Sequence, residues 1–414
     1  MQRTLDLSSV RSQYPALARM VGDRQAVFFD GPAGSQTPQC VADAVSDYLL
    51  RYNANEGGPF ATSRESDAMI AKAREAFRDL FGADHPDEVV FGPNMTSLTF
   101  QLSRALARTW KPGDEIIVTQ SDHDANVTPW VLAARDAGVT VHAIGIRPDT
   151  TLDLADFEHK LSERTRLVAF GAASNLSGTV HPIAKITAMA RAKGALTYVD
   201  AVHYAPHRLM DVAAWGCDFA VCSVYKFFGP HLGVMFGRQE LLEELEAYKV
   251  RPADNHGPEK WQTGTANFEG IAGALRAVDY LAELGAADAS GGRRAALADA
   301  YAAICHHEEQ LCATLLQGLQ AMNNLEIIGL SDPTQFADRV ATITFKHAQR
   351  NTKELAVALA ERGAFAWAGH SYAVPIVEAL ALQPEHLLRV GILHYHDETD
   401  VTRFLSALDE ALAS

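Results

Sequence analysis

Two charged residues, Lys226 and Asp200, each follow an apolar segment. This pattern is not typical of charged side chains on a solvated surface. Lys226 comes after residues 218–223 and leads into a Phe-Phe-Gly-Pro turn, which predicts a buried strand ending at the lysine. Asp200 ends a similar apolar run at residues 196–199. Desolvation lowers the pKa of a lysine and frees its amine to attack a carbonyl, which is Schiff-base chemistry. An amine and a carboxylate at the ends of neighbouring strands are the two protein groups that pyridoxal phosphate requires.

A phosphate-binding turn is expected beside such a lysine. Residues 91–97, Phe-Gly-Pro-Asn-Met-Thr-Ser, stand between a predicted strand and a predicted helix. Backbone amides at a helix N-terminus attract anions, and Thr96 would add a hydroxyl. Ser223 and Tyr225, close to Lys226 in the chain, are candidate donors to the same phosphate. Such a turn also simply caps helices, so the lysine is what favours the phosphate interpretation.

Further polar residues follow other predicted strands. His123 comes after residues 115–119, and its imidazole could stack on the cofactor ring and carry protons; a histidine bonded within its own loop is the alternative. Asn175 and His203 are placed to bond the phenolic oxygen of the cofactor. Asp200 would hold the ring nitrogen protonated, which makes the ring an electron sink.

The pattern of apolar runs predicts an α/β fold. Runs at 27–29, 89–91, 116–118, 139–144, 167–170, 196–199 and 219–221 alternate with helix-like segments, which indicates a mainly parallel sheet covered on both faces. Residues 232–236 follow Lys226 after a short turn and are expected to pair antiparallel. Long helices are predicted over 271–319 and a half-exposed strand over 339–345. We therefore expect a large domain at 21–270 and a smaller α+β domain formed by 1–20 and 271–414.

Composition excludes several classes of protein. The chain has 414 residues and a formal net charge of -15, which argues against nucleic-acid binding. No apolar stretch is long enough to span a membrane, and residues 1–20 lack the pattern of a signal peptide, so a cytoplasmic protein is expected. The five cysteines and sixteen histidines show no metal-ligand spacing, and we predict no metal. A dehydrogenase is disfavoured because no glycine fingerprint follows a strand.

At these motifs the chain resembles the class V aminotransferase superfamily, in its cysteine desulfurase-like branch of fold-type I pyridoxal-phosphate enzymes. The most specific segments are 122–126 (Asp-His-Asp-Ala-Asn), 174–179 (Ser-Asn-Leu-Ser-Gly-Thr), 200–203 (Asp-Ala-Val-His) and 223–226 (Ser-Val-Tyr-Lys). The resemblance extends from residue 29 to residue 389. It implies a large domain with a seven-stranded-type sheet and a smaller C-terminal domain.

The resemblance also implies roles for single residues. Lys226 would form the Schiff base, Asp200 would pair with the ring nitrogen and His123 would stack on the ring, with Asn175 and His203 at the phenolic oxygen. Asn94, Met95, Ser223 and Tyr225 look like phosphate ligands. Gly264 and Thr265 match a segment that reaches the phosphate of the neighbouring subunit, which implies a homodimer with shared sites. Arg389 is similar to the arginine that grips the substrate carboxylate, a task suited to a guanidinium fork. His370, Tyr372 and Arg64 are expected to line or gate the substrate site.

Three positions depart from the pattern of the desulfurases that this chain resembles. In that pattern a cysteine follows a Gly-His step and accepts sulfur as a persulfide, whereas here the loop 369–373 reads Gly-His-Ser-Tyr-Ala and places Tyr372 at the cysteine position. Tyr225 and His203 stand where many desulfurases have histidine and glutamine. A persulfide relay is therefore not expected, although cofactor binding is.

The leading hypothesis is a pyridoxal-phosphate enzyme that acts at the α-carbon of a small amino acid, as a desulfurase-like carbon–sulfur lyase that releases free sulfide or thiol. An amino-acid epimerase, with Tyr372 as a second acid, and an aminotransferase stay open within the same chemistry. A non-catalytic scaffold that binds the cofactor is the alternative from another class.

Overall fold

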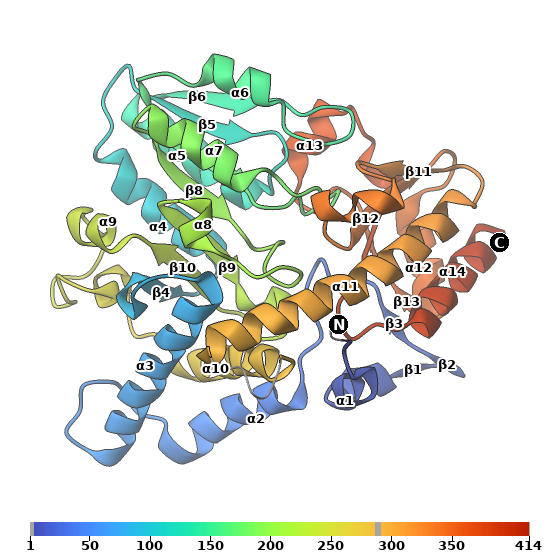
Figure 1. Cartoon of the computed structure of the whole chain (residues 1–414), viewed down its shortest axis with the longest axis horizontal. Helices are drawn as coiled ribbons and strands as arrows, with labels where there is room; N and C mark the ends of the chain where they lie inside the picture. Colours follow the sequence, from blue (N-terminus) through green and yellow to red (C-terminus); the bar gives the residue numbers. More distant parts are fainter. Residues whose placement is uncertain (1–3, 286–290, 414) are drawn as a thin grey trace.

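A seven-stranded sheet forms the centre of the larger part of the molecule in the computed structural model, which describes residues 4–285 and 291–413 (Figure 1). The strand order is β4-β10-β9-β8-β7-β5-β6. The pairs from β9 through β8, β7 and β5 to β6 are parallel, and β10 runs antiparallel to both of its neighbours. The strands are β4 (Val89–Gly92), β5 (Glu115–Thr119), β6 (Thr140–Ile144), β7 (Thr165–Gly171), β8 (Leu196–Asp200), β9 (Phe219–Ser223) and β10 (Gly233–Gly237). The mainly parallel sheet and the antiparallel strand after Lys226 are thus confirmed.

Both faces of this sheet are buried, because successive side chains of each strand enter different cores. In β7, Val168 and Phe170 belong to one hydrophobic cluster, while Leu167 and Ala169 belong to another. This alternation explains why the strands appear in the sequence as continuous apolar runs.

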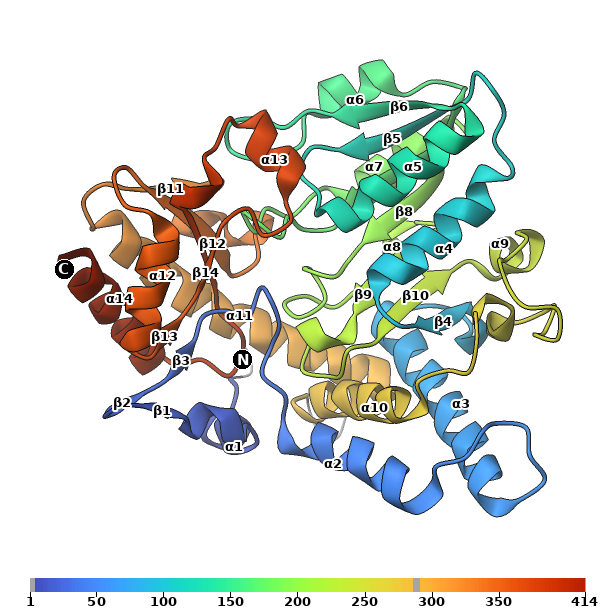
Figure 2. The same cartoon turned by 180° about the vertical axis from the view of Figure 1, so that it is seen from behind.

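Helices cover each face of the sheet. The face seen in Figure 2 carries α4 (Met95–Ala107) and α5 (Thr128–Ala137), whose Leu98, Leu102 and Trp130 enter the second cluster. The opposite core receives α3 (Ala61–Phe81), α7 (Ile183–Ala192) and α10 (Phe268–Glu283). Shorter helices of this part are α2 (Gln39–Asp47), α6 (Leu154–Lys160), α8 (Val212–Trp215) and α9 (Gln239–Glu244).

The C-terminal part has an antiparallel sheet of its own, in the order β11-β12-β15-β14. Its strands are β11 (Leu325–Ile328), β12 (Thr342–His347), β14 (Trp367–Ala368) and β15 (Leu387–Gly391), and its helices are α12 (Thr352–Glu361), α13 (Val374–Ala379) and α14 (Glu398–Ala413). The long helix α11 (Gly292–Gln320) connects the two parts. The sequence suggested a half-exposed strand here, and that was wrong: five of the six residues of β12 are buried. Ile343 and Phe345 pack with α11 and α14 on one face, while Thr342 and Thr344 on the other face bond to residues of the large part.

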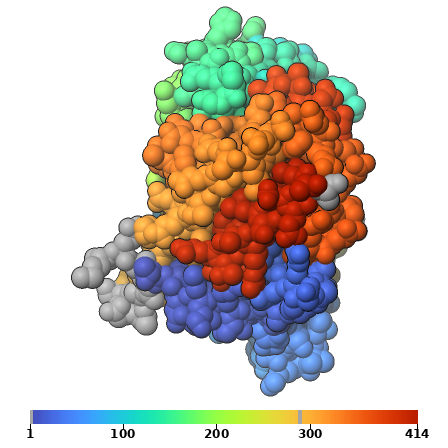
Figure 3. Space-filling view, turned by 90° about the vertical axis from the view of Figure 1, so that its right-hand side faces the viewer, coloured from blue at the N-terminus to red at the C-terminus, as the bar shows by residue number. Residues whose placement is uncertain are grey.

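The N-terminal segment lies beside the C-terminal helices. The short strand β3 (Val27–Phe28) was expected in the large sheet, but it pairs with β13 (Ala364–Phe365) instead. Helix α1 (Leu7–Ser12) is joined to α14 by an ion pair between Arg11 and Asp400, whose N and O atoms are 2.5 Å apart. Figure 3 shows the N-terminal segment in dark blue next to the red C-terminal helix. The strands β1 (Met20–Val21) and β2 (Arg24–Gln25) form a small hairpin. The division of the chain at residues 20 and 270 stays a prediction.

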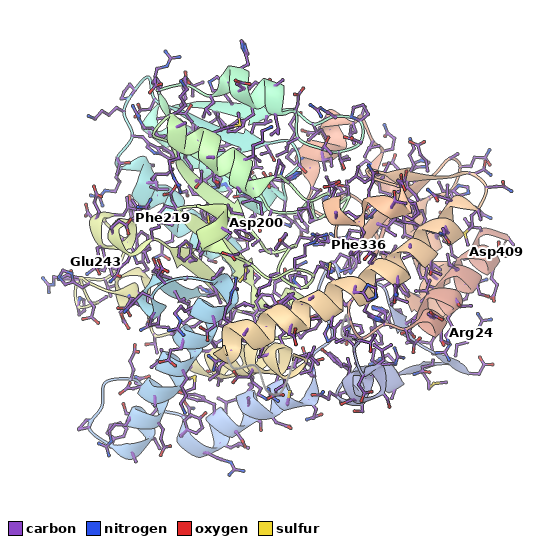
Figure 4. All side chains as sticks on the ribbon, viewed as in Figure 1. Arg24, Asp200, Phe219, Glu243, Phe336 and Asp409 are labelled. Atoms are coloured by element: carbon purple, nitrogen blue, oxygen red, sulfur yellow. The ribbon has the colours of Figure 1, made fainter. Side chains whose placement is uncertain are left out.

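The carboxyl ends of the parallel strands lie on the side of the sheet that faces the C-terminal part. Figure 4 shows Phe219, at the start of β9, on the far side and Asp200, at the end of β8, toward the C-terminal part. Loops after β5, β7, β8 and β9 therefore deliver their residues to one edge, as expected for an open α/β sheet. Within the described residues, no helix is both long and apolar enough to cross a membrane.

Candidate active site

Lys226 lies at this edge, at the end of the short 3-10 turn Val224–Lys226 that follows β9. Its Nζ donates hydrogen bonds to the carbonyl oxygens of Pro32 at 2.5 Å and Ala33 at 3.0 Å. Burial lowers the pKa of Lys226 to about 7; the charge of Arg389 lowers it further, while Asp200 opposes the shift. A substantial fraction of the amine is therefore neutral and nucleophilic near neutral pH.

Asp200 is the last residue of β8 and is 7% exposed. Its Oδ1 accepts a hydrogen bond from the backbone N–H of Val202 at 2.9 Å. Burial raises the pKa of Asp200 to about 6, although this hydrogen bond and Lys226 both act to lower it. A buried carboxylate with an unfavourable environment gains from a cationic partner, which is what a protonated pyridine ring offers.

The start of α4 faces the end of β9. The Asn94 side chain caps the helix by accepting a hydrogen bond from Ser97 N at 2.8 Å, and Met95 N donates to Ser223 Oγ at 3.0 Å. A Cβ on Gly233 would lie 2.3 Å from the carbonyl carbon of Asn94, so only glycine permits this close approach. Thr96 follows Met95 in the first turn of the helix. The structure thus assembles amides and hydroxyls at a helix N-terminus, as a phosphate site requires.

Tyr225 directly precedes the lysine in the chain and lies beside its amine. Its ring stacks on that of His231, with centroids 4.7 Å apart and planes 8° apart, and Lys226 Nζ lies 5.1 Å from the Tyr225 ring centroid. Burial raises the pKa of Tyr225. The phenol is therefore a neutral donor.

His123 follows β5 and has a fixed orientation. Its Nδ1 accepts a hydrogen bond from the backbone N–H of Ala125 at 3.0 Å, which leaves the proton on Nε2. Burial lowers the pKa of His123 to about 4, and the charges of Lys226, Arg389 and His370 add to the effect. The imidazole is neutral at physiological pH and can present its Nε2–H as a donor.

A loop from the C-terminal part covers His123. The Tyr372 ring stacks on the imidazole with centroids 5.5 Å apart and planes 20° apart. Asp124 N donates to Tyr372 O at 2.8 Å, and Asn175 Nδ2 donates to Ser371 O at 2.8 Å, so the loop is bonded to the ends of two strands of the large sheet. His370 lies beside Tyr372 and accepts from its backbone N–H at 2.9 Å. Tyr372 itself is 67% exposed.

Arg389, on β15, brings a buried guanidinium to the same place. It is 5% exposed and donates from Nη1 to the carbonyl oxygen of Asn175 at 2.7 Å. Within the described residues, Arg389 Nε and Asn175 Oδ1 are buried without a hydrogen-bond partner. Burial lowers the pKa of Arg389 to about 10. Buried polar atoms without partners are costly, so Arg389 Nε fits an anionic group, and Asn175 Oδ1 fits a hydrogen-bond donor, that the protein alone does not supply.

His203 completes the cluster on the side of β12. It is 4% exposed, and its Nε2 lies 2.9 Å from Thr342 Oγ1. Burial lowers the pKa of His203 well below its ordinary value. The charges of His207, Arg389, Lys226 and His123 lower it further. A neutral imidazole at this position can bond an oxygen without adding a charge.

Three residues expected at the site lie elsewhere in the single chain. Arg64 is exposed in the first turn of α3, where it donates to the carbonyl oxygen of Pro59 at 2.5 Å. Gly264 and Thr265 are exposed in the loop before α10, and a Cβ on Gly264 would meet nothing within 4 Å. The role of Arg64 at the substrate site stays a prediction, as does the role of Gly264 and Thr265 at the phosphate of a second subunit.

Sequence reasoning missed several contributors to the site. Thr342 at the start of β12 and the carbonyls of Pro32 and Ala33 come from distant parts of the chain and carry no local signal. Asp122, which directly precedes His123, is a further buried acid of the site. It is 3% exposed, its Oδ2 accepts from Thr119 Oγ1 at 2.6 Å, and burial, with a smaller effect of Asp200, raises its pKa to about 8.

The described residues contain no group of three or more histidine, cysteine or acidic residues that could hold a metal ion. Every cysteine is a free thiol. Cys217 and Cys222 are buried, and burial raises the pKa of both. Neither is therefore a reactive thiolate.

The residues present fit pyridoxal phosphate. A nucleophilic amine, a buried carboxylate, an anion-binding helix start and unpartnered groups at Asn175 and Arg389 meet at one edge of the sheet. The fold is similar to that of solved structures: the apo structure of a cysteine desulfurase from Thermococcus onnurineus matches with a TM-score of 0.88 at 23% identity over 99% of both chains. A cysteine desulfurase structure from Escherichia coli matches with a TM-score of 0.85 at 24% identity, again over 99% of both chains.

The chain belongs to the aminotransferase class-V family, whose model matches residues 27–404, and is an enzyme of that pyridoxal-phosphate-dependent family. It is 31% identical over 391 residues to a probable cysteine desulfurase of Streptomyces coelicolor, which covers 90% of this chain and 89% of the relative. It is 28% identical to a cysteine desulfurase of Serratia proteamaculans over 97% of both chains. The family predicted from the sequence motifs is therefore confirmed.

Proposed function

We propose that this protein binds pyridoxal phosphate at Lys226 and acts at the α-carbon of a small amino acid. The observation that carries the proposal is the buried Lys226 amine with its lowered pKa, placed at the same sheet edge as Asp200. When bound, the cofactor supplies an electron sink for negative charge at the α-carbon. The protein supplies the groups that bind, orient and move protons.

Each side chain has a distinct task in this proposal. Asp200 accepts a hydrogen bond from the protonated ring nitrogen and so keeps the proton there. The first turn of α4, with Ser223 and Tyr225, holds the phosphate. His123 would lie against the ring, and Asn175 and His203 would bond the phenolic oxygen. Lys226 Nζ would remove the α-proton, because its pKa of about 7 leaves a substantial fraction of the amine unprotonated near neutral pH.

The substrate carboxylate is proposed to bind Arg389. Arg389 Nε is a buried donor without a partner in the described residues. A carboxylate would accept hydrogen bonds from the guanidinium and satisfy it. The enzyme would therefore recognise an α-amino acid through its carboxylate at Arg389 and through the amine chemistry at Lys226.

Within this chemistry we propose a carbon–sulfur lyase. Relatives at 31% and 28% identity are named cysteine desulfurases. Tyr372 occupies the position where the resemblance leads us to expect the sulfur-accepting cysteine, and a phenol cannot accept sulfane sulfur. His123 Nε2–H is a donor for the departing sulfur. The β-substituent would therefore leave as free sulfide or thiol.

Product analysis tests the reaction. The purified protein, supplied with pyridoxal phosphate, is incubated with cysteine and with an S-substituted cysteine. The proposal expects sulfide or thiol together with pyruvate and ammonia, because alanine would form only if sulfane sulfur passed to an acceptor. Absence of each of these products with both substrates would contradict the lyase assignment while leaving cofactor binding intact.

Epimerisation is the second candidate, because Tyr372 contacts His123 and carries a phenol. The variant Tyr372→Phe separates the two reactions, since it keeps the stacked ring and removes only the hydroxyl. A lyase should retain activity within about threefold, whereas an epimerase that uses the phenol as an acid should lose about 10²–10⁴ in rate. Aminotransfer would be recognised by consumption of a 2-oxo acid.

The enzyme is proposed to be a homodimer. Gly264 and Thr265 are exposed in the single chain, as expected for a segment that reaches the phosphate of a neighbouring subunit. The molar mass in solution, measured by light scattering, tests this: a value near 90 kDa is expected from two chains of 44.9 kDa. A monomer that binds the cofactor fully would contradict the shared site.

A further inference from the structure

A buried acid–base pair joins the turn after β8 to α11. His207 Nδ1 lies 2.7 Å from Glu308 Oε2, and the two side chains are 3% and 0% exposed. The other carboxylate oxygen, Glu308 Oε1, is buried without a hydrogen-bond partner within the described residues. A carboxylate buried with one imidazole as its partner is a costly way to pack a helix. The pair therefore calls for a role beyond the hydrophobic core.

The turn that carries His207 also carries one residue of the proposed site and directly follows another. Residues 201–208 follow directly from Asp200 and contain His203. Helix α11 holds this turn at a second point, because Tyr301 Oη donates to the carbonyl oxygen of Ala205 at 2.7 Å. Tyr301 and Glu308 are seven residues apart and so lie on one face of the helix. Tyr301 and Glu308, on one face of α11, thus both bond to the turn 201–208.

His203 is the residue through which this contact reaches the site. Its ring meets that of His207 edge to face, with centroids 5.8 Å apart and planes 65° apart. On its other side, His203 Nε2 is 2.9 Å from Thr342 Oγ1. The ring is therefore held between His207, which Glu308 orients, and Thr342.

We propose that Glu308 is a positioning residue for the cofactor site: by holding His207 it fixes the orientation in which His203 meets the phenolic oxygen of pyridoxal phosphate. The inference rests on the proposed function. Glu308 is carried by the helix that connects the large sheet to the C-terminal part (Figure 1). A movement of α11 would accordingly change the position of His203 relative to the phenolic oxygen, because Glu308 contacts His207 and His207 contacts His203.

The variant Glu308→Gln tests the proposal in the loaded protein. The amide of this variant has nearly the same shape as the carboxylate and can still accept a hydrogen bond from His207, so α11 should still pack. The variant removes only the acidic character of residue 308. Glu309→Gln is the matched control, because Glu309 is exposed on the same helix one residue away. The readout is the pH midpoint at which the absorbance band of bound pyridoxal phosphate changes, with thermal unfolding measured in parallel.

We expect Glu308→Gln to move this midpoint by about half a pH unit or more, and Glu309→Gln to leave it within experimental error. In a His203→Gln background, the Glu308→Gln change should have no further effect on the midpoint. Glu308→Ala, which removes the acceptor, should shift it at least as far. If Glu308→Ala does not fold, the midpoint measured for Glu308→Gln still tests the proposal.

Two results would overturn the inference. A lower unfolding temperature with an unchanged midpoint would make Glu308 a purely structural residue. A full shift that persists in the His203→Gln background would show that Glu308 acts by another route. Failure of the proposed function is distinguishable, since the wild-type chain would then form no absorbance band with pyridoxal phosphate, and the inference would fall with it.

Discussion

The rings of His123 and Tyr372 stack with their centroids 5.5 Å apart and their planes 20° apart. The histidine comes from the large sheet and the tyrosine from the C-terminal part, so this contact joins the two parts directly over the proposed site. Tyr372 and Ser371 have φ values of 58° and 50°, in the left-handed region that non-glycine residues rarely adopt. The strained loop is held by hydrogen bonds to Asp124 and Asn175. Such strain is typical of functional loops.

A cysteine in place of Tyr372 should create a sulfur acceptor. We predict that Tyr372→Cys, incubated with cysteine, carries a protein-bound persulfide that alkylation and mass spectrometry detect at residue 372. The reason is that a thiolate accepts sulfane sulfur and a phenol does not. Tyr372→Ser is the control, because it shortens the side chain equally without a thiol. A Tyr372→Cys protein that binds the cofactor and never carries sulfur at this position would show that the loop is wrongly placed for transfer.

The lowered pKa of Lys226 predicts how cofactor uptake depends on pH. Only the neutral amine attacks the aldehyde, and the pKa of Lys226 is about 7. The rate at which the apoprotein takes up pyridoxal phosphate should therefore rise about tenfold per pH unit below pH 7 and level off above it. Stopped-flow absorbance measures this rate. A rate that still climbs tenfold per unit between pH 8 and pH 9.5 would mean that the amine has its ordinary pKa.

Asp122 should make the stability of the apoprotein depend on pH. Its pKa is raised from 3.8 to about 8, so between these values the folded chain holds a proton that the unfolded chain has lost. The stabilisation is complete below the unfolded pKa and is lost as the pH rises through the folded pKa. Relative to wild type, Asp122→Asn should therefore become more stable as the pH increases from 5 to 9, by on the order of 4 kcal/mol. Denaturant unfolding measures the difference; a value that does not change with pH would contradict the shift.

Arg389 should govern affinity for the substrate more than the rate of the chemical step. Arg389→Lys keeps the positive charge but loses the planar fork, so the carboxylate would be held by one point contact. We expect KM to rise about 10- to 100-fold, with a smaller change in kcat. Steady-state kinetics with the substrate found by product analysis measures both constants. Arg403→Lys, at an exposed position, serves as the control.

The sequence predicts the large sheet and much of the site for a physical reason. Parallel strands are buried on both faces and so appear as apolar runs, and their carboxyl ends meet at one edge. Asp200, Lys226 and His123 could thus be placed together because each follows such a run directly. Val27 gave the same apolar signal, yet β3 pairs with β13, because a short run does not specify its partner strand.

Contacts between distant segments were beyond sequence reasoning. The loop at Tyr372 was expected to line or gate the substrate site, but its stacking on His123 depends on how the C-terminal sheet sits against the large one. The pairing of Glu308 with His207 spans 101 residues and has no local pattern. Arg64 was expected near the substrate, and in the single chain it is exposed at the start of α3. The position of a residue in a helix does not reveal which neighbour its side chain contacts, so this role stays a prediction.

The most direct test of the account is to locate the covalent bond to the cofactor. The protein is loaded with pyridoxal phosphate, reduced with borohydride, digested and analysed by mass spectrometry, with Lys226→Ala treated in parallel. The account predicts a phosphopyridoxyl group on the peptide that contains Lys226, and none on the variant. Labelling of another lysine, or a wild-type protein that takes up no cofactor, would contradict it.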